Sequence, residues 1–560
     1  MTLSRRDLLR QTLGVTPLLL ASGCAGWLRP RRDYQEQRAD IVIIGGGLGG
    51  CAAALAACRR GQRVIMTEET DWIGGQLTQQ GVPPDENAWI ETIGGTASYA
   101  ALRRGLRDFY RQHPRLLGRA RNNPRLNPGN CWVSRIGCEP RAGVAVLEAM
   151  LAPHVASGQL SILREHRPVR ADVDGARIRS IEVESIGGRH VVLHADYFLD
   201  ATELGDLLPM TGTEYVSGAE SQRDTGEPHA PMTADPGNIQ SFTICFAIEH
   251  LPGEHHTIDR PADYATWRAM RLTVDGAQAP PLITFEDADS TRIGFDPVAR
   301  KGYWTYRRVI DRDLFEPGTF RSDITIVNWI QNDYSLGSLI DVSREEAATH
   351  IARAHAQNRA LLYWLQTEAP RPDGGTGWPG LRLRPDVMGT ADGWAKYPYI
   401  RESRRIRAEV TIREQDVLQS LRQDATGLPP EQLTATVFED SVGIGHYSMD
   451  LHLTTRGNRG QYGTTLPFQI PLGALIPQRV ENLIPACKNI GTTHLTNGCY
   501  RLHPIEWNIG ESAGALASRC VARKLPPRAI RNRVAERNDF QRELTRDGIP
   551  LQWPHPLPPR

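Results

Sequence analysis

Apolar residues form a short, unbroken run near the start of the chain. Residues 41–44 are apolar at every position, which is typical of a strand buried on both faces of a parallel sheet. Residues 51–58 contain only alanine, leucine and cysteine, which favours a helix. A second strand is predicted at residues 63–67, and Glu68 follows it. Strand, helix and strand in this order predict a βαβ unit and therefore an α/β fold.

The hydrophobic pattern predicts further elements along the chain. Helices are expected at residues 96–113, 144–152 and 343–365. Ser343 and Glu346 have the spacing of a capping box at the start of the last of these helices. Short strands are expected at residues 160–163, 179–184 and 195–199. The chain therefore combines the βαβ unit with a long mixed α+β region.

A glycine-rich turn joins the first predicted strand to the first predicted helix. Gly45, Gly47 and Gly50 have the G-x-G-x-x-G spacing of a dinucleotide-binding turn. There, the first glycine turns the chain tightly, the second leaves room for a pyrophosphate, and the third lets the helix lie close to the strand. The phosphates would lie at the positive end of that helix. Glu68 lies eighteen residues beyond Gly50, close to where an acidic residue binds the ribose hydroxyls.

No second turn of this kind is predicted. Residues 373–377 are rich in glycine, but a segment containing proline precedes them in place of an apolar strand, which favours a loop. The sequence therefore gives no indication of a nicotinamide-binding domain. It also lacks the G-x-S-x-G turn after a strand that a serine hydrolase would need.

The first residues have the pattern of an export signal. Arg5 and Arg6 form a twin-arginine pair, and the apolar run that follows at residues 13–21 is too short to span a bilayer. Residues 20–24 resemble a lipoprotein signal in which Cys24 receives a lipid, and ordinary cleavage nearby is the alternative. We therefore expect twin-arginine export to the periplasm or cell envelope, with a membrane tether if Cys24 is lipidated. Because this route moves folded proteins, it suits a protein that carries a cofactor.

Composition and charge narrow the function further. With 40% hydrophobic and 23% charged residues among 560, the chain has the composition of an ordinary globular protein. A formal net charge of +1 argues against binding of nucleic acid. The cysteines form no C-x-x-C pair, and His255 and His256 are adjacent, so no metal site is predicted. Buried free thiols are expected for most cysteines, with Cys131 and Cys138 as the closest-spaced disulfide candidates outside the first helix.

Several segments together resemble the FAD-dependent oxidoreductases of the FAD_oxidored family, whose dinucleotide domain is like that of glutathione reductase. The matching segments are residues 45–50, 74–78, 198–206, 401–406, 500–504 and 510–514. The resemblance implies an α/β, Rossmann-type FAD-binding domain with an inserted mixed α+β substrate domain. The expected order is an export signal (1–33), the first part of the FAD domain (39–211), the substrate or cap domain (212–468), the closing part of the FAD domain (469–525) and a surface tail (526–560).

The resemblance also implies FAD contacts. The residues assigned to it are Gly45, Gly47, Leu48, Gly49, Gly50, Glu68, Gly74, Gly75, Gln76, Thr78, Val169, Asp200, Gly510 and Glu511. Glu68 would bind the adenosine ribose, Asp200 would lie near the phosphates or ribityl chain, and residues 74–78 would pass beside the flavin ring. Val169 would lie against the adenine, or it is an ordinary strand residue.

Residues 507–515 are expected to begin a helix. Its free N–H groups would face the flavin, and a plain buried helix with small residues at a packing face is the alternative. Glu203 stands where the family more often has a small residue, which leaves the cofactor contact at that point open.

A flavin dehydrogenase needs a base for the substrate proton and a polar group that orients the reacting carbon. His503 is the leading candidate base, and fixing its loop by hydrogen bonds is its alternative role. Arg501 is expected to hold an anionic or hydroxylated substrate, and His446 is a second candidate base. Arg404 and Arg405 are expected in a charged helix start, on a solvated or salt-bridged face.

These residues predict an exported enzyme that oxidises a small organic molecule. Hydride would pass to flavin N5, and the electrons would pass on to a quinone, a cytochrome or oxygen. Two alternatives stay open: a reductase that runs in the opposite direction, and a flavin-carrying electron-transfer lipoprotein without substrate chemistry.

Overall fold

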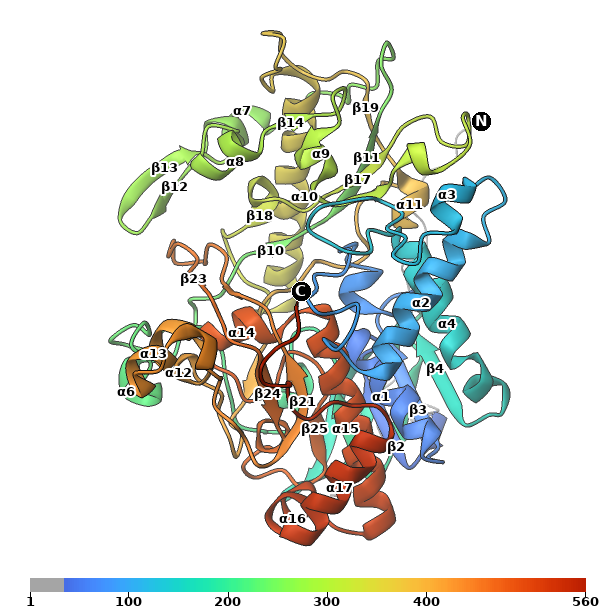
Figure 1. Ribbon diagram of the computed structural model, residues 1–560, viewed down its shortest axis with the longest axis vertical. Helices are drawn as coiled ribbons and strands as arrows, with labels where there is room; N and C mark the ends of the chain where they lie inside the picture. The colour runs from blue at the N-terminus through green and yellow to red at the C-terminus, as the bar shows by residue number, and fades with distance from the viewer. Residues whose placement is uncertain (1–34, 560) are drawn as a thin grey trace, which may run out of the picture.

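A parallel sheet forms the centre of the lower part of the molecule in Figure 1. The computed structural model describes residues 35–559, without side-chain placement for residues 288–290. The strand order is β25-β8-β2-β3-β4, and every neighbouring pair is parallel. The strands are β2 (Ile41–Ile44), β3 (Val64–Glu68), β4 (Leu160–Arg164), β8 (Tyr197–Asp200) and β25 (Leu483–Pro485). This topology confirms the predicted α/β fold with a Rossmann-type sheet.

Both faces of this sheet are covered. On one face, Ile41 and Ile43 share a core with helices α1 (Leu48–Arg59) and α15 (His503–Arg523). On the other face, Val42 and Ile44 share a core with a second sheet. The second sheet has the order β1-β7-β6-β5, from β1 (Gln35–Arg38), β5 (His166–Asp174), β6 (Arg177–Ser185) and β7 (His190–His194). Burial on both sides explains why every position of β2 is apolar.

Helices α1 and α15 cross in close contact, the first blue and the second red in Figure 1. A Cβ on Gly510 would lie 2.0 Å from the carbonyl oxygen of Gly49, and one on Gly514 would lie 2.3 Å from that of Ala53. Only glycine fits at these two positions of α15. The crossing places the first turn of α1 beside the first turns of α15.

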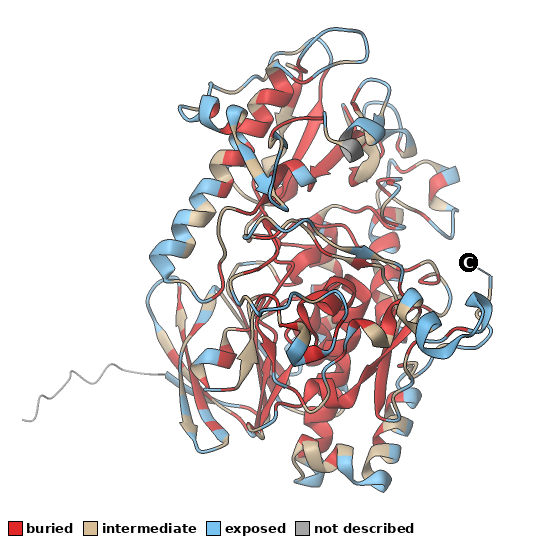
Figure 2. Cartoon of the chain, turned by 90° about the vertical axis from the view of Figure 1, so that its left-hand side faces the viewer, coloured by how far each residue is buried: buried red, intermediate tan, exposed pale blue. Residues whose placement is uncertain are grey.

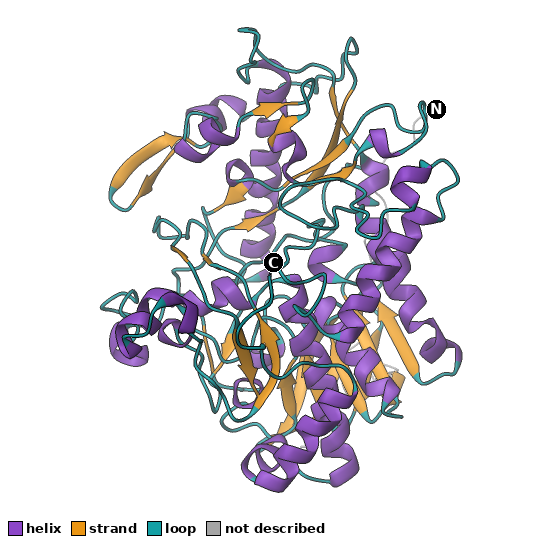
Figure 3. Cartoon of the chain, in the orientation of Figure 1, coloured by secondary structure: helices purple, strands orange, loops and turns teal. Residues whose placement is uncertain are grey.

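Two more helices complete this core, and the upper part of the molecule has a core of its own. Helices α2 (Ala97–Arg111) and α4 (Pro140–Ala156) join the core around α1. The upper part contains the antiparallel sheet β16-β17-β11-β19 and the long helix α10 (Arg344–Thr367), which Figure 3 shows beside these strands. Its strands are β11 (Phe246–His250), β16 (Arg308–Ile310), β17 (Ile324–Val327) and β19 (Leu381–Leu383). Figure 2 shows buried residues in the interior of both parts.

Short elements connect these layers. The helices are α3 (Gly118–Arg121), α5 (Leu207–Met210), α6 (Gln222–Thr225), α7 (Tyr264–Ala269), α8 (Ala288–Ile293), α9 (Tyr303–Tyr306), α11 (Pro385–Met388), α12 (Glu414–Val417), α13 (Gln419–Thr426), α14 (His494–Tyr500), α16 (Pro527–Asn532) and α17 (Val534–Arg546). The paired strands are β9 (Tyr215–Val216) with β20 (Arg405–Ile406), β10 (Phe242–Thr243) with β18 (Asp333–Tyr334), β12 (Arg271–Val274) with β13 (Ala277–Pro281), β14 (Phe295–Asp296) with β15 (Lys301–Gly302), β21 (Ser441–Gly445) with β24 (Phe468–Pro471), and β22 (Met449–Asp450) with β23 (Tyr462–Gly463).

Several local predictions are corrected by the structure. Strand β5 was not predicted, and it forms a hairpin with β6. Arg405 begins strand β20 and is fully buried, so the predicted helix start is wrong there, whereas the salt-bridged alternative is right because Arg405 pairs with Glu402 and Glu220. Beyond residue 526 the chain forms α16 and α17, and Phe540 of α17 is fully buried, so this segment is more than a surface tail.

Two further observations concern the described part of the chain. The eight cysteines within it are all buried and free. No helix between residues 35 and 559 is both long and apolar enough to cross a membrane. The predicted export signal and Cys24 lie outside the described residues.

Candidate cofactor and substrate site

The glycine-rich turn lies between the end of β2 and the start of α1. Gly45 has a φ of +103°, and a Cβ there would lie 2.2 Å from the carbonyl oxygen of Ala201. A Cβ on Gly50 would lie 2.1 Å from the carbonyl oxygen of Gly45. The turn therefore needs glycine at both positions, for its backbone angle at the first and for close packing at both. It leaves the first N–H groups of α1 free to bind an acceptor.

Two carboxylates of the chain accept hydrogen bonds from this turn. The Gly49 N–H donates to Glu506 Oε1 at 3.2 Å, and the Gly46 N–H donates to Glu68 Oε2 at 3.1 Å. A helix N-terminus stabilises negative charge, and these carboxylates stand where an anionic ligand group would bind. The turn therefore has the donors that the diphosphate of FAD requires, and the site fits this cofactor.

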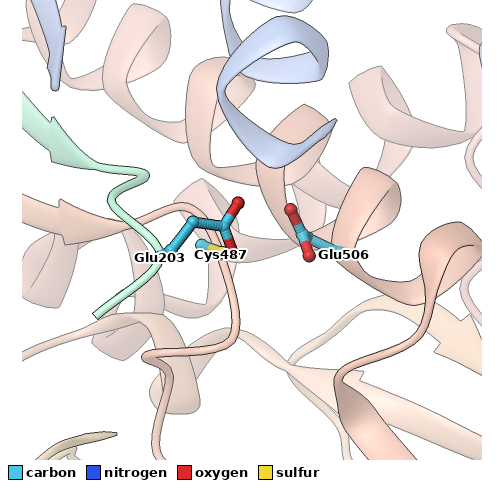
Figure 4. A group of neighbouring side chains, drawn as sticks. All are labelled: Glu203, Cys487 and Glu506. Atoms are coloured by element: carbon cyan, nitrogen blue, oxygen red, sulfur yellow. The ribbon is translucent and has the colours of Figure 1, made fainter. Parts of the chain in front are cut away.

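A buried cluster of charges lies beside the same turn. Figure 4 shows the carboxylates of Glu203, from the loop after β8, and Glu506, from α15, facing one another beside Cys487. One ligand atom from each of these residues lies within 4.8 Å of the others, a spacing that a metal ion would accept. Lys488 already supplies a cation there, because its ammonium contacts Glu203 and lies 3.3 Å from Cys487 Sγ and 3.8 Å from Glu506 Oε2. We therefore assign no metal to this cluster.

Lys488 is the cation nearest to the carboxylates on the turn. Burial opposes its charge, but Cys487, Glu203 and Glu506 raise its pKa well above the usual value for lysine. The side chain is charged at any working pH. Its observed partners are Glu203, Cys487 and Glu506, beside the glycine turn, and no pattern in the sequence pointed to this lysine.

Glu68 lies at the end of β3, beside the turn. Its carboxylate accepts hydrogen bonds from the Thr70 N–H at 2.8 Å and from Gln79 Nε2 at 2.9 Å, and burial raises its pKa to about 7. A small cavity here is lined by the turn, by Glu68 and by Pro168 of β5. The strand contacts this cavity through Pro168, one position before Val169. The pairing of β5 with β6 shifts register at Val169, and the predicted contact of its backbone with the adenine stays a prediction.

Residues 74–78 pass directly beneath the turn. A Cβ on Gly75 would lie 2.9 Å from Gly47 Cα, so the two glycine segments are packed against each other. Gln76 Nε2 donates to Glu506 Oε2 at 2.7 Å and to the carbonyl oxygen of Arg501 at 3.1 Å. Thr78 Oγ1 donates to the carbonyl oxygen of Ile73 at 2.7 Å and shapes this loop.

Asp200 shapes its own loop. One carboxylate oxygen accepts from the Thr202 N–H at 3.0 Å and hydroxyl at 2.7 Å, and the other accepts from the Leu207 N–H at 3.2 Å. Burial raises its pKa to about 7. The carboxylate therefore positions the loop that carries Glu203, and its predicted contact with the cofactor stays a prediction.

Helix α15 begins earlier than predicted. Its first residue is His503, so residues 507–515 lie inside the helix and their N–H groups are used within it. Gly510 packs against α1, and Glu511 accepts a hydrogen bond from Ser98 Oγ at 2.7 Å. Both residues thus have partners within the protein, and their predicted contact with FAD stays a prediction. At the start of the helix Pro504 has no N–H, and the N–H groups of Ile505 and Glu506 both donate to the carbonyl oxygen of Leu502.

The two nitrogens of His503 are held by backbone groups. Its Nδ1 accepts from the Asp85 N–H at 3.2 Å, and its Nε2 donates to the carbonyl oxygen of Val82 at 3.0 Å. The ring is fully buried, and burial lowers its pKa to about 4. His503 therefore fixes the loop at residues 82–85, which is the alternative role given to it from the sequence, and its assignment as the base stays untested.

A cavity of about 600 Å³ adjoins the N-terminal end of α15. It is lined by Arg501, Leu502 and His446, which include two of the three predicted catalytic residues. Arg501 donates to the Tyr399 hydroxyl at 2.8 Å and to the carbonyl oxygen of Asp450 at 3.0 Å. The bond from Gln76 to the backbone of Arg501 connects this cavity to the glycine turns. The size and position are those of a small-molecule site.

His452 lines this cavity and pairs with the buried carboxylate of Asp333 behind it. His452 Nδ1 lies 2.6 Å from Asp333 Oδ2, and its Nε2 lies 3.6 Å from Asp450 Oδ2. Arg401 binds the other oxygen of Asp333 at 2.9 Å. Burial alone would raise the pKa of Asp333, but Arg401 and His452 hold it below its usual value. Asp333 therefore stays ionised and fixes His452 with its Nδ1 protonated.

The sequence analysis missed this pair. Asp333 and His452 are 119 residues apart, so no local motif joins them. The available signal was the spacing of Asp450 and His452. They are two positions apart, which places both side chains on one side of an extended segment.

Comparison with known proteins identifies the family of the chain. A model of the FAD dependent oxidoreductase family matches residues 40–544. No curated protein matches the chain by sequence.

Several solved structures are similar to the chain at low identity. The chain is 12% identical to p-nitrophenol 4-monooxygenase from Pseudomonas putida DLL-E4, with a TM-score of 0.35 over 92% of this chain and 88% of that one. It is 11% identical to a variant of quinol fumarate reductase from E. coli, with a TM-score of 0.32 over 91% and 74% of the two chains. For L-proline dehydrogenase from P. horikoshii the identity is 14% and the TM-score 0.18, and the match spans 33% of this chain and 25% of that one. From the family match, the chain belongs to the FAD dependent oxidoreductase family and is an enzyme that uses FAD.

Proposed function

We propose that this oxidoreductase is a dehydrogenase that removes hydride from a small organic substrate held in the 600 Å³ cavity. FAD, when bound, supplies the hydride acceptor at its N5 atom. The electrons then pass to an acceptor other than a nicotinamide, such as a quinone, a cytochrome or oxygen. The observation that carries this proposal is the pairing of Asp333 with His452, which lines the cavity.

His452 has the geometry of a general base. Because Asp333 accepts the proton on Nδ1, the lone pair on Nε2 is left to take a proton from a substrate hydroxyl. The carboxylates of Asp333 and Asp450 stabilise the imidazolium that forms. Arg501, held by Tyr399 and Asp450, orients a polar group of the substrate.

The proposal is tested by anaerobic reduction of the FAD-loaded enzyme. A panel of alcohols, hydroxy acids and amines is screened for bleaching of the flavin absorbance, and the rate is then measured for His452→Gln and Asp333→Asn. A general base contributes about 10²–10⁴-fold to the rate, so we expect at least a 10²-fold loss in His452→Gln.

His154→Gln is the matched control, because His154 lies on α4, outside the cavity. The proposal is wrong if His452→Gln reduces its flavin at the wild-type rate with the same pH profile. If an organic compound oxidises the reduced enzyme, and no compound of the panel reduces the oxidised enzyme, the reductase alternative is favoured. Electron exchange that is insensitive to both cavity variants would favour the carrier.

We also propose that the protein reaches the periplasm or cell envelope by the twin-arginine route and binds no nucleic acid. The support is the Arg5–Arg6 pair, the short apolar run after it and the small net charge. Replacing both arginines by lysine should retain the protein in the cytoplasm. Cys24→Ser should release it from membranes if Cys24 carries a lipid, and unchanged fractionation would favour ordinary cleavage.

A further inference from the structure

Several residues that line the cavity carry hydrogen-bond donors without partners. Among the described residues, Arg307 Nε, Arg401 Nε, Arg501 Nε and Asn328 Nδ2 are buried and have no hydrogen-bond partner. All four side chains line the cavity. These atoms can only donate, and a buried donor left unpaired costs about 1–3 kcal/mol. The cavity therefore favours a ligand rich in acceptors.

The acceptors of the cavity are already engaged. Asp85 binds Arg307 through two bonds of 2.9 and 3.2 Å. Asp333 binds Arg401 and His452, and the Glu86 carboxylate pairs with Arg103. Arg401 and His452, together with Arg501, lower the pKa of Asp450 against the effect of its burial.

Three of the arginines that line the cavity, Arg307, Arg401 and Arg501, are held rigidly by contacts within the protein. Arg401 and Arg501 are each only 2% exposed, and Arg501 is fixed by Tyr399. A guanidinium that is already oriented loses little entropy when it binds a carboxylate. The unpaired Nε–H groups are therefore prepared for an acidic ligand group.

Aromatic side chains add a second feature to the cavity. Trp132 and Tyr462 line it and are 59% and 72% exposed, which is unusual for large aromatic residues. The Trp132 ring lies 4.8 Å from that of Tyr306, which also lines the cavity. Such rings offer a flat apolar surface with a polar edge, which suits the face of a hydroxylated ring.

We infer that the cavity binds a hydroxylated ring compound that carries a carboxylate, such as a uronic acid. This inference rests on the proposed function, because it names the class of substrate for the same site. The carboxylate accepts hydrogen bonds from the Arg401, Arg501 and Asn328 group, and a neighbouring hydroxyl faces His452. The ring packs against the aromatic side chains.

The experiment measures the binding of glucuronate and of glucose to the FAD-loaded enzyme. Binding is measured by calorimetry and from the change in the flavin spectrum. The two compounds share a ring and differ at the carboxylate. We expect glucuronate to bind at least tenfold more tightly than glucose, with a preference that decreases as salt is added. Equal binding of both, or binding of glucose alone, would overturn the inference.

Three variants test the residues. Asn328→Leu removes the unpaired amide donor, and Asn328→Asp replaces it with a charge that repels a carboxylate. Both should reduce the preference for glucuronate, and Asn328→Asp should reduce it at least tenfold. FAD content and Tm report whether each variant is folded. Arg501→Lys keeps the charge but loses the Nε donor and should show an intermediate preference.

Failure of the inference can be distinguished from failure of the proposed function. If a neutral compound reduces the flavin at a rate that depends on His452, the substrate class is wrong and the proposed function stands. If glucuronate binds with the expected preference but flavin reduction by every compound is insensitive to His452, the proposed base is wrong and the ligand class stands.

Discussion

Replacing Lys488 by methionine removes the cation from the buried cluster while keeping most of the side-chain volume. Lys488 is 2% exposed, and its partners Glu203 and Glu506 are both buried. Removing one partner of a buried ion pair costs about 3–5 kcal/mol, because the remaining charge has no compensation. Burial already raises the pKa of Glu506, and loss of Lys488 will raise it further. Protonation then relieves part of the cost at lower pH.

The variant should therefore be destabilised most at high pH. We expect the apoprotein to lose about 3 kcal/mol at pH 8 and less at pH 6, where the carboxyl group is protonated more readily. A hydrogen bond to a charged group contributes about 1.5–3 kcal/mol, so loss of the ammonium should raise the Kd for FAD about 10–100-fold.

These quantities are measured by thermal unfolding of the apoprotein at both pH values and by fluorescence titration with FAD. Lys301→Met is the control, because Lys301 is exposed on β15. A Lys488→Met protein with unchanged stability at pH 8 and an unchanged Kd for FAD would refute the role of this cation. A loss of stability with an unchanged Kd for FAD would mean that Lys488 pairs with the carboxylates but does not contribute to FAD binding.

Three further predictions follow from the same core. Gly510→Ala places a methyl group against the Gly49 carbonyl, so we expect a lower Tm and weaker FAD binding, and wild-type values would contradict the close crossing. Because burial raises the pKa of Glu68 to about 7, above the unfolded value of about 4.3, the protonated form stabilises the fold and this contribution is lost as pH rises through 7. The Tm of the apoprotein should therefore fall between pH 5 and pH 8, and Glu68→Gln should flatten the slope; an identical slope in the variant would exclude Glu68. His503→Ala should lower the Tm, because the bonds of His503 to the loop at residues 82–85 are lost. The pH profile of flavin reduction should keep its shape, and a flattened profile would support His503 as the base.

The predictable part of the site is local in sequence. The strand, the glycine turn and Glu68 lie within residues 41–68, where spacing alone implies proximity. Lys488 meets Glu203 across 285 residues, and only the folded sheet brings the ends of β25 and β8 together. The pairing of His452 with Asp333 is equally remote, so sequence reasoning selected the histidine nearest to a recognised motif.

The errors in secondary structure also have physical causes. Strand β5 contains Pro168, which argues against a central strand, but β5 lies at the edge of its sheet, where proline is tolerated. Helix α15 begins after Leu502, which provides no side-chain cap, so the sequence carries only Pro504 as a starting signal. Helical spacing also could not show that Gly510 faces α1 and not the cofactor.

The amide of Gln76 couples the binding of FAD at the glycine turn to the binding of a ligand in the cavity. It donates to Glu506, whose carboxylate accepts from the Gly49 N–H, and to the backbone of Arg501 in the cavity wall. A phosphate bound at the Gly49 N–H would displace this carboxylate. A cavity ligand that favours one position of this amide will change the affinity for FAD, and FAD will change the affinity for that ligand by the same factor. Retention of the cofactor should therefore depend on what occupies the neighbouring cavity.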